Sequence, residues 1–72
     1  MSNQTAQQIQ QALIRRREVE RRTALSRSRI YDLMAKGLFP KPIRLGEMTV
    51  AWVDSEIDAW IAARIADSRK AA

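Results

Sequence analysis

The chain has 72 residues, a formal net charge of +5, and neither Cys nor His. A domain of about 70 residues buries only about 60% of the surface that its unfolded chain exposes, so without disulfides or zinc sites a compact apolar core must hold it together. The commonest general base and the thiol nucleophile are both absent, so we expect a binding domain and not an enzyme, with no metal, no cofactor and no small-molecule substrate.

Residues 1–12 are polar and rich in Gln, and we expect them to form a flexible lead-in. They lack the apolar segment of a signal peptide, and no apolar run reaches the ~20 residues of a membrane span. The sequence therefore predicts a cytoplasmic protein with no membrane contact. The apolar pair at residues 13–14 is either a brief strand or the start of the core. Residues 17–22 then predict a short helix, since acidic side chains lie in its first turns and arginines near its end.

A second helix follows after a short turn. Residues 23–25 interrupt the helical pattern, and Ser26 is a favourable N-cap. The helix should run from residue 27 to about residue 36, because three apolar side chains recur at helical spacing. These are Ile30, Leu33 and Met34. Gly37 provides a left-handed residue to end the helix, and Leu38 is expected to pack back over that end.

Two prolines force residues 39–42 into an extended segment. Residues 43–45 and 50–53 then predict two strands, joined by a four-residue loop at residues 46–49. Met48 lies at the tip of this loop, where it is either a wedge for the minor groove of DNA or an incidental exposed side chain.

The third helix begins in the acidic segment at residues 54–58, where Ser55 and Asp58 match an acidic variant of the capping box. Its inward-facing residues are expected at helical spacing. They are Ile57, Trp60, Ile61 and Ile65. We expect Trp52 and Trp60 to pack in the core and not to stack on nucleotide bases, and residues 67–72 to form a frayed tail.

The order helix, turn, helix, hairpin, helix predicts a mainly α fold with a small β-hairpin, a winged helix-turn-helix domain over residues 13–66. Charge is divided unevenly along the chain. Residues 12–45 contain ten Lys and Arg against three Asp and Glu, a net charge of +7, whereas residues 46–72 contain three against five, a net charge of −2. Segregated basic charge is typical of a nucleic-acid contact surface.

Four segments of the chain, residues 25–34, 39–46, 50–52 and 55–60, together resemble the AlpA family of phage-type regulators. Residues 25–34 (LSRSRIYDLM) resemble its helix-turn-helix, and residues 39–46 (FPKPIRLG) resemble the start of its wing. Residues 50–52 (VAW) and 55–60 (SEIDAW) are similar to its closing strand and last helix, so the resemblance covers about residues 13–66. It implies a winged helix-turn-helix related to MerR-type and excisionase domains, double-stranded DNA as the partner, and a role in the transcription of prophage or mobile-element genes.

Two positions depart from the family pattern. Ala24 stands where the family often has Gly in the turn between the helices. Residues 47–49 (EMT) stand where the family often has Gly-Arg-Ala at the wing tip. The second change removes a basic residue and adds an acid, which is unfavourable beside DNA phosphates.

The second helix is the expected recognition helix, since such helices insert their N-terminal residues into the major groove. Its candidate DNA-contacting residues are Arg27, Ser28, Arg29, Tyr31, Asp32 and Lys36. An arginine can pair bidentately with guanine, and an aspartate can accept a hydrogen bond from cytosine N4. Two of these residues keep a second interpretation, in which Tyr31 packs on the protein and Asp32 only orients an arginine.

Phosphate contacts are expected from basic residues before the first helix and near the wing. They are Arg15, Arg16, Arg17, Lys41 and Arg44. For the arginine triplet, a cluster that is simply solvated is the alternative.

The leading hypothesis is a sequence-specific regulator of transcription. One alternative is an excisionase-like factor that bends attachment-site DNA, and another is a protein-interaction module that uses the last helix. The regulator is favoured over the excisionase because the wing tip carries Glu47 and Met48, and an acid that faces DNA phosphates is unfavourable for a wing that must grip the minor groove. A single helix-turn-helix reads few base pairs, so a homodimer or several copies on neighbouring sites are expected.

Overall fold

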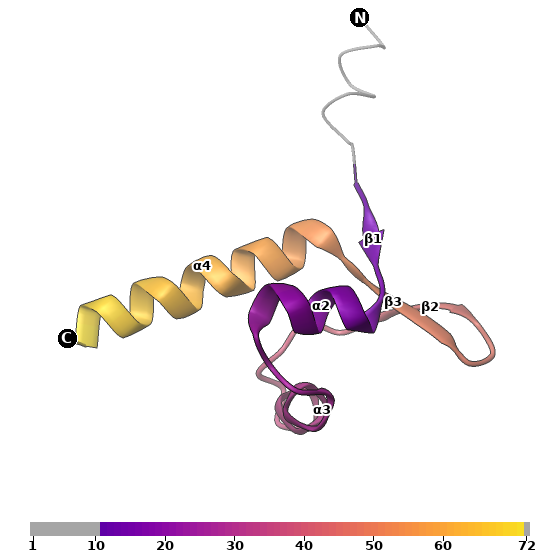
Figure 1. Ribbon diagram of the computed structural model, residues 1–72, viewed down its shortest axis with the longest axis horizontal. Coiled ribbons are helices and arrows are strands. Elements are labelled where there is room, and N and C mark those ends of the chain that lie inside the picture. The colour runs from indigo at the N-terminus through magenta and orange to yellow at the C-terminus, as the bar shows by residue number, and fades with distance from the viewer. Residues whose placement is uncertain (1–10, 72) are drawn as a thin grey trace, which may run out of the picture.

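A computed structural model describes residues 11–71, which form three helices and a small antiparallel sheet. The elements in chain order are β1 (Leu13–Ile14), α2 (Arg16–Thr23), α3 (Arg27–Ala35), β2 (Ile43–Gly46), β3 (Thr49–Val53) and α4 (Asp54–Ala71). This arrangement confirms the predicted mainly helical fold with a hairpin, a winged helix-turn-helix. Helix α2 lies between α3 and α4 and also contacts β3 (Figure 1). Most of the expected flexible lead-in falls in residues 1–10, outside the described residues.

The core lies where α2, α3 and α4 meet β3. Its buried side chains come from all of these elements and from the segment after α3. They are Val19, Ile30, Leu33, Phe39, Trp52 and Ile57. Met34 packs against this cluster from the same face of α3, so the predicted apolar face of that helix is confirmed.

Both tryptophans fasten the segment between α3 and β2 to the rest of the fold. The Trp52 indole N–H donates to the Pro40 carbonyl at 3.0 Å, and the Trp60 indole N–H donates to the Leu38 carbonyl at 2.9 Å. The Trp60 ring also packs edge-on against Phe39, with 4.9 Å between ring centroids. The core position predicted for Trp52 is confirmed, whereas Trp60 is half-buried at the edge of the core.

The turn between α2 and α3 depends on a left-handed alanine. Ala24 has a φ of 62°, and its N–H donates to the Glu20 carbonyl at 2.8 Å. Thr23, predicted to begin the turn, is still helical and donates its hydroxyl to the Val19 carbonyl at 2.7 Å. The predicted N-cap of α3 is confirmed, since Ser26 Oγ accepts the Arg29 N–H at 3.1 Å.

Helix α3 ends in backbone hydrogen bonds around Gly37, whose φ is 72°. The Gly37 N–H donates to the Met34 carbonyl at 3.0 Å, and the Leu38 N–H donates to the Leu33 carbonyl at 2.8 Å. These two bonds form a Schellman motif, as the glycine predicted. The Leu38 side chain is 57% exposed, so the expectation that it packs over the helix end was wrong. Its backbone alone closes the helix.

The sheet has the order β1-β3-β2, with every pair antiparallel. The hairpin turn is shorter than predicted, because Gly46 still pairs with Thr49 and only Glu47 and Met48 form the turn. An irregularity between Arg44 and Gly46 shifts the register and allows this extra pair. The Met48 side chain at the tip is 93% exposed.

Helix α4 differs from its prediction at both ends. It starts at Asp54 directly after β3, so Ser55 lies inside the helix, and Asp58 bonds to Arg22 in place of a capping box. Its inward face is shorter than expected, since Ile65 is 46% exposed. The helix continues to Ala71, beyond residue 66, after which a frayed tail was expected.

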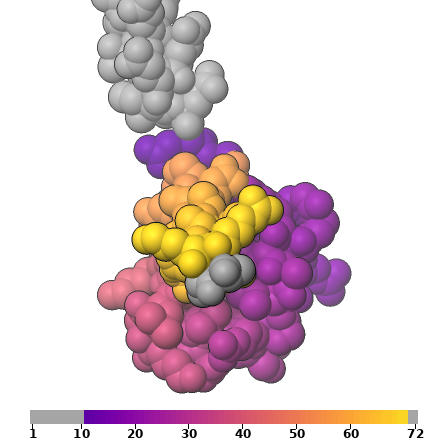
Figure 2. Space-filling view, turned by 90° about the vertical axis from the view of Figure 1, so that its left-hand side faces the viewer, coloured from indigo at the N-terminus to yellow at the C-terminus, as the bar shows by residue number. Residues whose placement is uncertain are grey.

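Alanines favour this extension of α4, and an ion pair at 2.8 Å between Arg64 and Asp67 adds to it. The extension projects beyond α2 (Figure 1), and its end stands in front of the rest of the molecule in Figure 2. Among the helices of residues 11–71, none is both long and apolar enough to cross a membrane.

Candidate nucleic-acid interface

The face of α3 opposite the core is polar and open to solvent. Because Ile30 and Leu33 are buried, the helical repeat turns the remaining side chains outward. The exposed members are Arg27, Ser28, Arg29, Tyr31 and Lys36, and Asp32 is half-exposed among them. All six candidate residues predicted on this helix therefore share one accessible surface, which we call the α3 face.

Charged and aromatic side chains on the α3 face are ordered by contacts with one another. Asp32 Oδ2 accepts a hydrogen bond from Arg29 Nη1 at 2.7 Å and lies 3.2 Å from Lys36 Nζ. The Arg27 guanidinium lies 5.7 Å from the centre of the Tyr31 ring, a distance at which a cation is attracted to the ring. One carboxylate therefore holds two of the three cations of this face, and the third lies over an aromatic ring.

A hollow beside the α3 face brings the arginine triplet to the same surface. It lies between the start of α2, α3 and the hairpin. Its lining residues are Arg15, Arg16, Arg17, Arg27, Tyr31, Met48 and Val50. We call it the arginine hollow. It is lined by four arginines and no carboxylate, so positive charge is concentrated in the space between α3 and the hairpin.

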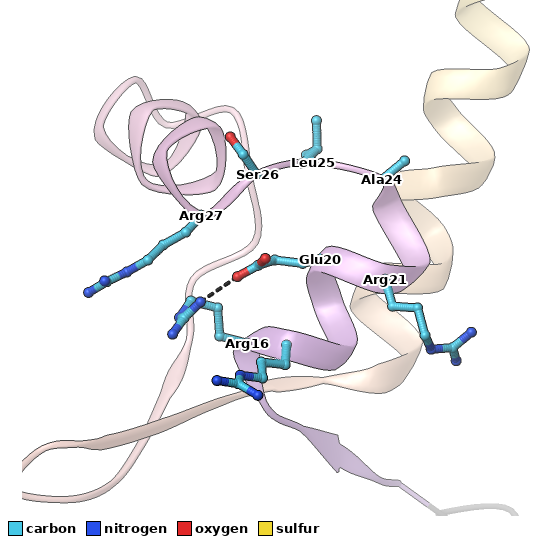
Figure 3. A pocket seen from close by; sticks show the side chains of 8 residues that line it. Arg16, Glu20, Arg21, Ala24, Leu25, Ser26 and Arg27 are labelled. Atoms are coloured by element: carbon cyan, nitrogen blue, oxygen red, sulfur yellow. Dashed lines mark hydrogen bonds and ion pairs between the residues drawn. The ribbon is translucent and has the colours of Figure 1, made fainter.

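A second, shallower depression adjoins the arginine hollow between α2 and the start of α3 (Figure 3). Arg16 and Glu20 form an ion pair in it, and Arg21 points away from Arg27. Arg21 also hydrogen-bonds to Glu18, and this bond lowers the pKa of the Glu18 carboxyl. Arg21 was not among the predicted site residues, although its position one turn after Arg17 would have placed it on the same side of α2.

Not every predicted basic residue joins this surface. Lys41 and Arg44 are exposed but line neither depression, and Arg44 Nη2 donates to the Glu47 carbonyl at 3.5 Å. Arg22, also in the basic half of the chain, forms ion pairs with Asp54 and Asp58 of α4. Its guanidinium links α2 to α4 and therefore does not belong to the arginine hollow. Residues 11–71 contain no cluster of acidic side chains that could hold a metal ion.

The family model described as "Prophage CP4-57 regulatory protein (AlpA)" matches residues 12–65. The chain belongs to the AlpA family. Its match to the AlpA family begins just before β1 and ends within α4, so it includes the α3 face and the arginine hollow but leaves out the last turns of α4. The resemblance noted in the sequence is thereby confirmed.

Two relatives are similar to this chain over most of its length. ORF88, an uncharacterized protein of Enterobacteria phage P4, is 46% identical over 61 residues, which cover 85% of this chain and 69% of ORF88. The DNA-binding transcriptional activator AlpA of Escherichia coli (strain K12) is 33% identical over 70 residues, which cover 89% of this chain and 94% of that protein.

Proposed function

We propose that this protein is a transcriptional regulator that binds double-stranded DNA sequence-specifically and controls prophage or mobile-element genes. The observation that carries the proposal is the continuity of the α3 face with the arginine hollow. A regulator needs one surface for base edges and another for phosphates, side by side. Membership of the AlpA family, and a relative named as a DNA-binding transcriptional activator, support the same function.

The α3 face supplies the groups that read bases. With α3 in the major groove, Arg27 and Arg29 lie near its N-terminal end, where such helices contact base edges. Ser28 adds a hydroxyl on a short side chain beside them. Tyr31 and Lys36 extend the surface toward the DNA backbone. An arginine at such a position can donate two hydrogen bonds to one guanine.

The arginine hollow supplies phosphate contacts. Within residues 11–71, Arg15 and Arg17 of this hollow form no ion pair with a carboxylate, so their charge is available to a phosphate. Each phosphate that is neutralised releases counterions, which favours binding at low salt. Lys41 and Arg44 are exposed just before and within β2, and they add positive charge on the hairpin side of the domain.

Selectivity requires more than one copy. A single α3 face reads few base pairs, so we propose that two or more molecules occupy neighbouring sites or that a dimer forms on DNA. Native mass spectrometry of the protein with a bound duplex measures this directly. Two or more copies for each selected duplex are expected, and a strict one-to-one complex with full selectivity would contradict the proposal.

DNA binding is tested by fluorescence anisotropy with duplexes from a pool that has a randomised centre. We expect binding whose logarithm of affinity falls linearly with the logarithm of salt concentration, by about 0.9 for each phosphate contact. Arg17→Ala should reduce that slope by about one contact. Arg69→Ala removes the same charge from the exposed end of α4 and should leave the slope unchanged. Absence of duplex binding at low salt would overturn the proposed function.

Regulation is tested separately, with a promoter reporter and circular-permutation gel shifts on the same selected site. A regulator should change reporter output and bend the DNA only weakly. Strong bending by several phased copies, with no change in reporter output, would assign the protein to recombination in place of transcription.

A further inference from the structure

We infer that Asp32 sets the sequence selectivity of the α3 face by positioning Arg29 and Lys36, and that it does so without contacting a base. This inference rests on the proposed DNA-binding function. It gives the one carboxylate among the cations of the α3 face a distinct role, in place of the cytosine contact that its residue type allows.

The geometry places one carboxylate between two cations. Arg29 lies one turn before Asp32 and Lys36 one turn after it, and both contact the same oxygen, Oδ2, at 2.7 Å and 3.2 Å. The side chain of Asp32 is 44% exposed, less than those of its two partners. The carboxylate therefore lies between the two cations it binds, and those cations are more exposed to a ligand than it is.

These contacts prepare Arg29 to read a base. The guanidinium has five N–H donors, and only Nη1 is occupied by Asp32. The others are sufficient for a bidentate contact with guanine O6 and N7. Because the side chain is already held in one orientation, less conformational freedom is lost on binding. Asp32 thereby favours a directional hydrogen-bonded contact between Arg29 and a base over a general attraction of Arg29 to phosphates.

The same contacts oppose binding to DNA of the wrong sequence. A phosphate that attracts Arg29 or Lys36 must compete with the carboxylate that already holds them, and it also meets the negative charge of Asp32. Only a duplex with a hydrogen-bond acceptor at the right base gives Arg29 a contact that is more favourable than the interactions with Asp32 that binding weakens. Asp32 thus lowers affinity for all sequences and raises the difference between them.

Helix α4 offers a matched control for this role. Arg64 and Asp67 form an ion pair with the same three-residue spacing at 2.8 Å, on the exposed end of α4. Asp67→Asn removes the same charge from the same local arrangement, away from the α3 face. Because Asp32 and Asp67 are both outside the core, neither substitution should prevent folding, and circular dichroism checks this.

The experiment measures the affinity of wild-type protein, Asp32→Asn and Asp67→Asn for two duplexes. One is the duplex that the wild-type protein selects from the randomised pool, and the other is a scrambled duplex of the same composition. We expect Asp32→Asn to bind the scrambled duplex several-fold more tightly, with a salt slope that is steeper by about 0.9 for each cation released. Its preference for the selected duplex should fall about tenfold. Asp67→Asn should match the wild type in both respects.

A double-mutant cycle separates positioning from a direct contact. If Asp32 acts through Arg29, then Arg29→Ala should reduce selectivity in the wild type and have little further effect in the Asp32→Asn protein. Additive losses, or a loss of preference confined to one cytosine, would overturn the inference in favour of a direct contact. Unchanged selectivity in Asp32→Asn would overturn it as well, while leaving DNA binding in place. Failure of the wild-type protein to bind any duplex is seen first, and rejects the proposed function and this inference together.

Discussion

Helices α3 and α4 use the same local interactions in different surroundings. In α3, Arg27 lies 5.7 Å from the centre of the Tyr31 ring, and Arg29 pairs with Asp32 three residues later. In α4, a single arginine makes both kinds of contact. This residue, Arg64, lies 5.5 Å from the centre of the ring of Trp60, which is one turn earlier in the helix. It also forms an ion pair with Asp67, three residues later.

The two helices differ in what supports them and in what lies beside them. Two side chains of α3 are buried, and its other face continues into the arginine hollow. Helix α4 is buried only near its start, and residues 62–70 are all exposed, with no arginine triplet nearby. The local pattern is therefore the same, and its placement in the fold makes one helix a candidate binding surface and the other a projecting arm.

The largest expected difference between the two helices is in stability, when isoleucine is replaced by alanine in each. Ile30→Ala should lower the free energy of unfolding by about 2–5 kcal/mol, because Ile30 is fully buried. Ile65→Ala should change it by about 0.5 kcal/mol or less, since its side chain is 46% exposed. Urea unfolding followed by circular dichroism measures both. Equal losses would show that the end of α4 is packed as α3 is.

The next comparison concerns the two paired arginines. Arg29→Ala should weaken binding to the selected duplex by about 1–3 kcal/mol if it reads a base. Arg64→Ala removes a similar ion pair from α4 and should leave the affinity within about twofold of the wild type, because at most a distant charge is lost. Anisotropy titrations at one salt concentration measure both affinities. A comparable loss for the α4 variant would extend the DNA-binding surface to that helix.

Two arginines of α2 sharpen the comparison, because Arg22 faces α4 and Arg17 faces the arginine hollow beside α3. Arg22→Met should cost about 1–2 kcal/mol of stability, because its partly buried side chain pairs with two carboxylates of α4. It should leave the salt dependence of DNA binding unchanged. Arg17→Met should do the reverse, with little loss of stability and a slope reduced by about 0.9. Unfolding and salt titrations on both variants check this, and a reduced slope for Arg22→Met would contradict the structural role of Arg22.

The smallest effect, and the most specific, is a difference of sign. Ala24→Gly should be neutral or stabilising by up to about 1 kcal/mol, because Ala24 adopts a left-handed conformation that glycine reaches without strain. Ala62→Gly lies inside α4 and should be destabilising by up to about 1 kcal/mol. Thermal unfolding of the two variants is compared with that of the wild type. A lower melting temperature for Ala24→Gly would contradict the strain at this turn.

Much of the fold could be predicted because its signals are local. The hydroxyl of Ser26 caps the helix that begins one residue later, and the lack of a side chain at Gly37 allows the left-handed turn that ends it. Helical spacing placed Ile30 and Leu33 inside, and this same spacing correctly predicted the exposure of the opposite face of α3. Each of these signals acts between residues within about one turn of helix, so it can be recognised from their spacing in the sequence.

The sequence by itself therefore determined where α2, α3 and the two hairpin strands lie, where α4 begins, and which face of α3 meets solvent. Only the tertiary structure decided which charges remain available. Arg17 and Arg22 are both basic residues of one short helix, yet one faces the arginine hollow and the other binds carboxylates more than thirty residues away. The physical reason is that an ion pair depends on distance in space, and the packing of α4 and the hairpin against α2 sets that distance.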